Sequence, residues 1–181
     1  MIFRRFLEPD KSVLSARRLY DGLVVRAREP VFHREFGVPD TIDGRFDLLA
    51  LHAFAVLDAL KSAGPAGAKL GAELASVIFT GFDEALRELG VGDMGISRRM
   101  KALAGAFYGR LEAYGGADSV PALSEAIARN LYREDGMHGP EADLLAHYIL
   151  VARDSLRSQA ETLLQGSADF GPLPEFPSAP T

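Results

Sequence analysis

The sequence has no cysteine and no tryptophan among its 181 residues. Without a thiol it can form no disulfide, no thiolate nucleophile and no cysteine-ligated zinc or iron–sulfur site. It also lacks any apolar run near the roughly 18 residues that a membrane-spanning helix needs. Its hydrophobic fraction of 48% and charged fraction of 25% are those of an ordinary globular protein. The length favours one domain with a packed core.

No third of the chain has an excess of positive charge. The formal net charge is −5, and successive thirds contain 9, 7 and 4 basic residues against 9, 7 and 9 acidic residues. A nucleic-acid-binding surface normally requires a net basic region. We therefore predict that the protein has no nucleic-acid partner.

The first residues combine apolar and basic side chains but lack the apolar core of a secretion signal, which is about 7–15 residues long. We therefore expect a cytoplasmic protein. The alternatives for this segment are a packed or frayed end and a peripheral contact with the cytoplasmic face of the inner membrane, because its apolar and basic side chains suit an anionic interface. The residues that would make the membrane contact are Ile2, Phe3, Arg4, Arg5 and Phe6.

Apolar residues recur at helical spacing through most of the chain, and strand-like alternation is never sustained. Ser12 and Ser97 are expected to cap two of the helices, and residues 62–71, rich in glycine, alanine and proline, are expected to be a connection. The predicted fold is all-α, with six or seven helices in one domain. The expected helices cover residues 12–27, 41–60, 72–89, 97–114, 120–132 and 141–164, with a short turn at 31–36.

Three parts of the chain differ in composition. Residues 1–11 form an N-terminal segment, and residues 12–165 form the helical domain. Residues 166–181 contain four prolines and only scattered apolar residues. Such a segment buries too little apolar surface to offset the entropy of ordering it, so we expect a disordered tail.

The titratable residues show no strong catalytic motif. None of the four histidines lies three or four residues from another, as a helical metal site would require. Asp40, Asp43 and Asp47 lie close together, and Asp43 and Asp47, one helical turn apart, could raise each other's pKa. Acidic residues near a helix N-terminus also complement the helix dipole, and this is the interpretation that we favour.

The helix expected from Ser97 has two unusual features. Arg98, Arg99 and Lys101 crowd its N-terminal turn, where the dipole disfavours cations, which predicts an anionic partner or an acidic neighbour. Small residues form a stripe that would let another helix approach closely. We expect that helix to be an internal neighbour, with a partner protein as the alternative. The stripe consists of Ala102, Ala106, Gly109 and Ala113, with Gly105 beside it.

Two segments together resemble a known family. Residues 37–47, GVPDTIDGRFD, are followed by Leu48, Leu51 and His52, and residues 89–110 read LGVGDMGISRRMKALAGAFYGR. These blocks and their spacing strongly resemble the ubiquinol-cytochrome c chaperone family over about residues 12–155 of this chain. The resemblance implies an all-helical, non-enzymatic protein, without cofactor or metal, that binds newly made cytochrome b during assembly of the bc1 complex. It also implies a possible small partner protein or a ribosome contact.

The resemblance and the charges together indicate the candidate partner-binding residues. We expect the two blocks to adjoin in space and to form one client-facing patch. Its acidic residues would meet the basic cytoplasmic loops of a membrane protein, and its basic residues would meet anionic headgroups. The candidates are Asp40, Asp43, Arg45, Asp47, His52, Asp93, Arg98, Arg99, Lys101, Tyr108 and Arg110.

Two other classes of function remain open at this point. One is an all-α metal-dependent hydrolase or lyase that uses Asp40, Asp43 and Asp47 with His52. The other is a haem or quinone carrier with His52 or His147 as the axial ligand.

Overall fold

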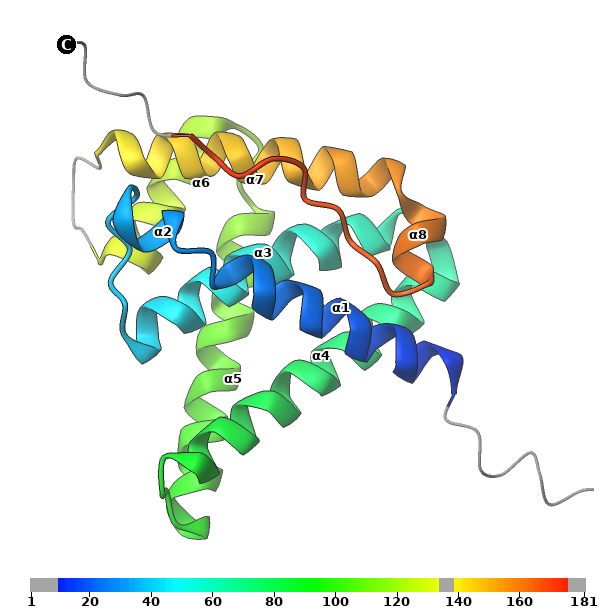
Figure 1. Ribbon diagram of the computed structural model, residues 1–181, viewed down its shortest axis with the longest axis vertical. Helices are drawn as coiled ribbons and strands as arrows, with labels where there is room; N and C mark the ends of the chain where they lie inside the picture. The colour runs from blue at the N-terminus through cyan, green and yellow to red at the C-terminus, as the bar shows by residue number, and fades with distance from the viewer. Residues whose placement is uncertain (1–9, 134–138, 176–181) are drawn as a thin grey trace, which may run out of the picture.

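The computed structural model describes residues 10–133 and 139–175, which fold into helices with no strand among them (Figure 1). The all-α prediction is confirmed, with six helices of eight or more residues in this part of the chain and several shorter ones. In chain order the elements are α1 (Lys11–Ala27), α2 (Val31–Arg34), α3 (Ile42–Lys61), α4 (Gly64–Glu88), α5 (Asp93–Gly115), α6 (Val120–Ile127), the π-helix η2 (Ala128–Tyr132), α7 (Pro140–Ser158) and α8 (Ala160–Leu164).

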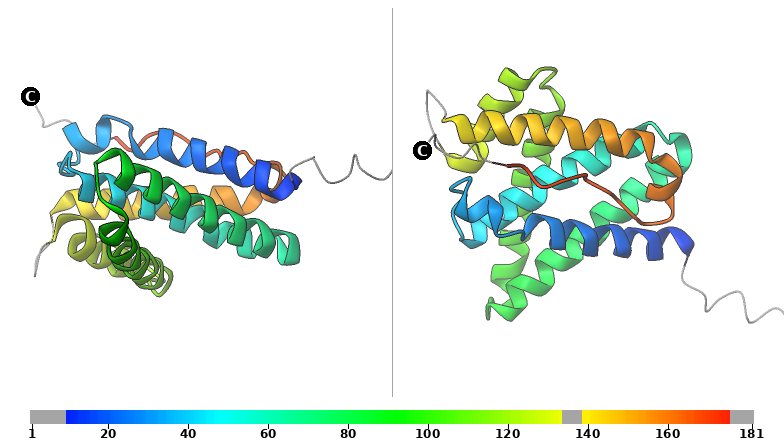
Figure 2. Two further views of the ribbon diagram at one scale, coloured as in Figure 1. Left: turned by 90° about the horizontal axis from the view of Figure 1, so that it is seen from below. Right: turned by 45° about the horizontal axis from the view of Figure 1, so that its top comes forward.

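Helix α3 lies at the centre of the domain. It contacts α1, α4, α5 and α7, which surround it in Figures 1 and 2. Alanines at positions 50, 53, 55 and 59 are fully buried, and such small residues let neighbouring helices approach closely. A helix that is apolar on most sides is typical of a protein core, so α3 organises the packing of the others.

Two predicted helix starts are wrong. Asp10 caps α1 in place of Ser12, because its Oδ1 accepts a hydrogen bond of 3.1 Å from the backbone N–H of Ser12. Helix α5 begins at Asp93 in place of Ser97, and Asp93 in its first turn suits the positive end of the helix dipole. By contrast, the helix expected from residue 41 begins close to that position, and Thr41 caps α3 by accepting a hydrogen bond of 3.1 Å from the N–H of Gly44.

The predicted connection at residues 62–71 is also wrong, because most of it belongs to α4. Gly64, with φ of 63°, makes the turn after α3, and Pro65 then occupies the first turn, where its missing N–H costs nothing. A Cβ at Gly67 would lie 2.0 Å from the carbonyl oxygen of Leu60. The small residues therefore allow two helices to meet at a tight turn.

In the structure, each of the two helices predicted nearest the C-terminus is divided into two elements. The helix expected over 120–132 ends as the π-helix η2, after which Arg133 adopts a left-handed φ of 56°. The helix expected over 141–164 breaks at Gln159 into α7 and α8. The side chain of Gln159 hydrogen-bonds both the backbone N–H and the carbonyl of Asp169, at 3.2 and 3.0 Å.

Residues 166–175, which we name the strap, run in extended form between α1 and α7 (Figures 1 and 2). They belong to the segment expected to be a disordered tail, yet Phe170 within them is only 6% exposed. One buried aromatic ring and several side-chain bonds to backbone groups hold the strap. Residues 176–181 of the expected tail, and the N-terminal residues proposed to touch a membrane, lie outside the described residues.

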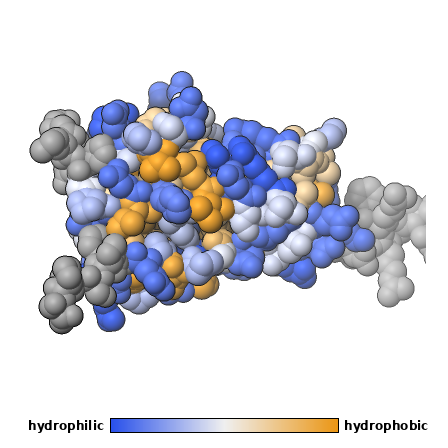
Figure 3. All heavy atoms as spheres, turned by 90° about the horizontal axis from the view of Figure 1, so that it is seen from above, coloured by the Kyte–Doolittle hydropathy of each residue, from blue (hydrophilic) through white to orange (hydrophobic). Residues whose placement is uncertain are grey.

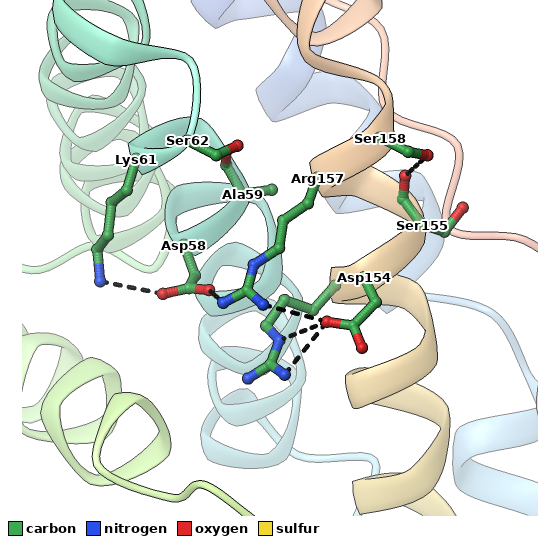
Figure 4. A network of polar contacts seen from close by, with 9 residues as sticks. Asp58, Ala59, Lys61, Ser62, Asp154, Ser155, Arg157 and Ser158 are labelled. Carbon is green, nitrogen blue, oxygen red and sulfur yellow. Dashed lines mark hydrogen bonds and ion pairs between the residues drawn. The ribbon is translucent and has the colours of Figure 1, made fainter.

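Ion pairs join the C-terminal ends of α3 and α7 (Figure 4). Arg157 Nη2 lies 2.6 Å from Asp58 Oδ2, and Lys61 Nζ lies 3.1 Å from Asp58 Oδ1. Partial burial raises the pKa of Asp58, but the hydrogen bonds from Lys61 and Arg157 outweigh it and lower that pKa. Within residues 10–133 and 139–175, no helix is both long and apolar enough to cross a membrane.

Candidate functional site

The two family-like blocks meet at the buried carboxylate of Asp47. This residue of α3 is completely buried, and its Oδ1 lies 2.6 Å from Nη2 of Arg110 in α5. Its Oδ2 accepts a hydrogen bond of 2.8 Å from Nη1 of Arg133, which follows η2. Burial raises the pKa of Asp47, and the two guanidinium groups oppose the rise. The carboxylate thus joins α3, α5 and the residue that follows η2 from inside the domain.

Arg110 connects the blocks by two further contacts. Its guanidinium lies 5.0 Å from the centre of the Phe46 ring, within the range of a cation–π interaction. Its Nη1 donates a hydrogen bond of 3.0 Å to the carbonyl oxygen of Ala106. Arg110 is only 14% exposed, so it serves the junction more than the surface.

The other acidic candidates point outward. Asp40 Oδ1 accepts a hydrogen bond of 2.7 Å from Arg45 Nε, and this bond lowers the pKa of Asp40. Asp43 is 81% exposed, and its Oδ2 lies 3.8 Å from Arg133. Asp43 and Asp47, one turn apart, therefore occupy different environments. In the described part of the chain, no three histidine or acidic side chains are grouped so that they could hold a metal ion.

His52 lies in a separate buried network. Its Nδ1 donates to the Leu48 carbonyl at 2.8 Å, so its Nε2 must accept from the Tyr148 hydroxyl at 3.1 Å. Burial lowers the pKa of His52 to about 4, which keeps the ring neutral. Both ring nitrogens are thus occupied, and His52 offers neither a free metal or haem ligand nor a surface contact.

The sequence did not indicate the partners of His52. Arg26 Nε donates to the Tyr148 hydroxyl at 2.8 Å, and Arg26 Nη2 donates to the carbonyls of Gly171 and Pro172 at 2.7 and 2.9 Å. The ring of Phe170 packs edge-on against His52, with centroids 5.5 Å apart. No local motif identifies this network, because its members come from α1, α3, α7 and the strap.

Apart from Arg110, the basic residues of the second block lie exposed on α5. Because the helix begins at Asp93, Arg98 and Arg99 lie beyond its first turn, where the dipole acts only weakly. The unfavourable interaction of these cations with the helix dipole is therefore weaker than it would be in the first turn, where the predicted start at Ser97 would place them. Asp93 is 90% exposed and accepts a hydrogen bond of 3.2 Å from Arg87. Lys101 is also exposed.

Ala102, Gly105 and Gly109 of the α5 stripe face solvent, whereas Ala106 and Ala113 are half-buried and Ala113 packs against the core. The expectation of an internal helix neighbour is therefore wrong for the exposed part of the stripe. Nothing lies within 4 Å of the positions that a Cβ would take at Gly105 and Gly109. Tyr108 between them is 53% exposed, and its ring lies 5.7 Å from that of Phe79 in α4. We name this surface the outer face of α5: Arg98, Lys101, Ala102, Gly105, Tyr108 and Gly109.

An apolar groove of about 320 Å³ opens between α1, α3, α4 and α5. Phe46, Leu49 and Phe82 contribute to its lining, as do Ile42 and Leu89, which are 66% and 57% exposed. Hydrophobic side chains also gather on part of the face that bears α6 and α7 (Figure 3). Val151 of α7 is 54% exposed. Exposed apolar surface of this kind commonly marks an interaction site.

The chain is similar to known proteins over most of its length. The model of a family described as ubiquinol-cytochrome C chaperone matches residues 34–170. Among solved structures, the crystal structure of the Cbp3 homolog from Brucella abortus is similar, with a TM-score of 0.81 and 39% sequence identity. The similarity covers 95% of this chain and 97% of that one. No curated protein matches.

Proposed function

The chain belongs to the ubiquinol-cytochrome C chaperone family, and we propose that it is a non-enzymatic chaperone that binds cytochrome b during assembly of the bc1 complex. The observation that carries the proposal is the family match over residues 34–170. The 39% identity with the Cbp3 homolog over nearly the whole chain supports it further. We place the activity in the cytoplasm, at the inner face of the membrane into which the client is inserted.

We assign the client contact to the outer face of α5. A membrane-protein client presents apolar helices, and helices pack most closely where small residues leave the backbone accessible. Gly105 and Gly109, four residues apart, leave such a surface, and Tyr108 provides an exposed aromatic anchor beside it. Arg98 and Lys101 extend the face with charges that would orient the client.

The acidic candidates divide into contact residues and structural residues. Asp40, Asp43 and Asp93 are exposed and suit the lysine- and arginine-rich cytoplasmic loops of a membrane protein. Asp47 is buried and would act by holding α3 against α5 and Arg133. Arg110 and His52 likewise support the scaffold from within, whereas Arg45 and Arg99 remain available for contact.

Leucine substitutions on the outer face of α5 test this assignment. Gly105→Leu with Gly109→Leu would block close approach of a client helix, and co-purification of cytochrome b should be lost. The matched control is Gly22→Leu on α1, where an added Cβ likewise meets nothing within 4 Å. Both variants should fold, because replacing glycine inside an exposed helix raises helix propensity. Equal recovery of cytochrome b with the folded α5 variant would overturn the assignment.

The same purification would identify accessory contacts. A small partner protein or a ribosome bound with the client should appear in the eluate of the wild-type chain and decrease together with cytochrome b in the α5 variant.

A further inference from the structure

A basic hollow lies beside the apolar groove. It has a volume of about 430 Å³ and is lined by Arg28, Pro30, His33, Arg34, Asp40 and Arg45. Arg28 and Arg45 also line the groove, so the hollow and the groove share part of their walls. The molecule therefore places a cationic cavity next to an apolar one.

The charges of the hollow are incompletely matched. Arg45 pairs with Asp40 at 2.7 Å, and His33 Nε2 lies 3.8 Å from the same carboxylate. Arg28 and Arg34 form no ion pair with any residue in the ranges that the structure describes. Cations gathered around a concave surface focus a positive potential. A phosphate would accept hydrogen bonds from their guanidinium groups with favourable geometry.

The apolar groove has the dimensions of a small-ligand site. Its volume of about 320 Å³ is at the lower end of the range for ligand pockets, roughly 300–1,000 Å³. It suits a single hydrocarbon chain better than a helix, whose diameter with side chains is about 10–12 Å. Ile42 and Leu89 leave more than half of their surface in water at this groove, which suits contact with a membrane interface.

We propose that the groove and the hollow together bind an anionic phospholipid of the membrane surface. One acyl chain lies in the groove, and the headgroup phosphate lies at Arg28 and Arg34. Ile42 and Leu89 contact the surrounding lipid. This site differs from the outer face of α5 and does not depend on the identity of the client.

Vesicle binding of the full chain tests the headgroup contact. At about 0.1 M salt, the wild-type protein should sediment with vesicles that contain phosphatidylglycerol. It should sediment much less with vesicles of pure phosphatidylcholine. Arg28→Gln with Arg34→Gln should weaken binding roughly 30-fold, since each basic residue near an anionic surface contributes about a fivefold effect. The control pair Arg17→Gln with Arg129→Gln has the same charge change on other surfaces and should bind nearly as the wild type does. Equal weakening by both pairs, or none by the first, would overturn the proposal.

Filling the groove tests the acyl-chain contact. Ala85 lines the groove and is exposed, so Ala85→Phe should occupy the space of the chain and reduce vesicle binding. Ala68→Phe, at another exposed position of α4, is the matched control and should have no effect. Binding of free myristate without binding to phosphatidylglycerol vesicles would also contradict the phospholipid assignment. Circular dichroism of each variant establishes that the fold is retained.

Discussion

Asp47 is a buried charge on which the junction of α3, α5 and Arg133 depends. Its carboxylate is fully shielded from water and is held by guanidinium groups at 2.6 and 2.8 Å. A buried ion pair contributes little net stability relative to apolar residues, but removal of one partner leaves a desolvated charge behind. The two arginines differ in exposure, at 14% for Arg110 and 50% for Arg133.

We expect Arg110→Ala to lower the free energy of unfolding by about 3 kcal/mol, because it leaves the Asp47 carboxylate without its buried partner. Arg133→Ala should cost about 1 kcal/mol, since water can partly replace its exposed guanidinium. Urea denaturation of the two variants measures both values. Equal and small effects would show that Asp47 does not depend on Arg110.

His52 makes stability depend on pH. Its pKa falls from 6.5 to about 4 because the ring is buried, with nearby Arg26 adding to the effect. The unfolded chain takes up a proton below pH 6.5, whereas the folded protein resists protonation until about pH 4. The contribution of the neutral His52 ring to the free energy of unfolding is therefore fully present at neutral pH. It is lost as the pH falls from 6.5 to about 4, by about 3 kcal/mol in total.

The expected result is a folded protein in which the His52 ring signals, followed by NMR, do not titrate between pH 7 and 5, while its unfolding free energy declines. His52→Gln should reduce the slope of stability against pH in that range. A His52 titration midpoint near 6.5 in the folded protein would contradict the buried network.

At the residue level, His52 is expected from the sequence on the client-facing patch, and the structure buries it completely. The burial of His52 could have been read from its position in the apolar run from Leu48 to Val56. The different fates of Asp43 and Asp47 could not, because they depend on Arg133, which is 86 residues distant from Asp47 and follows a π-helix. Long-range ion pairs leave no local signal.

At the scale of the elements, periodicity located the helices but not their ends. The apolar spacing in α3 and α7 follows from their packing in the core, so it is visible in the sequence. The start of α4 was missed because glycine, alanine and proline are common in loops and are also what a tight helix–helix turn requires. The small-residue stripe of α5 was recognised, but its exposure depends on which neighbours pack against the opposite side.

The strap is a second element that composition misrepresents. Its prolines and polar residues suggest disorder, yet Phe170 contacts His52, while Arg26 and Gln159 bind its backbone carbonyls. The strap thereby covers the buried histidine network. Its attachment depends on one aromatic ring together with these hydrogen bonds.

Phe170→Ala should therefore lower the free energy of unfolding by about 3 kcal/mol, the usual cost of removing a buried aromatic ring. Leu173→Ala, at a partly buried position of the same strap, should cost no more than about 1 kcal/mol. Chemical denaturation measures both changes. Backbone amides of the strap should exchange hydrogen faster in Phe170→Ala than in the wild type. An unchanged free energy of unfolding in Phe170→Ala would contradict the attachment of the strap through this ring.

Across the whole molecule, surface charge is distributed so that its sum says little about function. The net charge of −5 arises in the last third, whereas the family-like blocks lie in the balanced part. Their buried charges join helices, and their exposed charges flank the outer face of α5 and the basic hollow. The outer face of α5 and the basic hollow thus differ in chemistry, as our proposals of a protein client for the first and a lipid for the second require.

The role that we propose for the chain is to assist cytochrome b during assembly of the bc1 complex. The most direct measurement is the abundance of cytochrome b and the activity of bc1 after deletion of the gene, alongside other respiratory complexes. Both should be lost while the other complexes persist. The wild-type gene and the Gly22→Leu gene should restore them, whereas Gly105→Leu with Gly109→Leu should not. Normal cytochrome b abundance and bc1 activity in the deletion strain would contradict the proposed role.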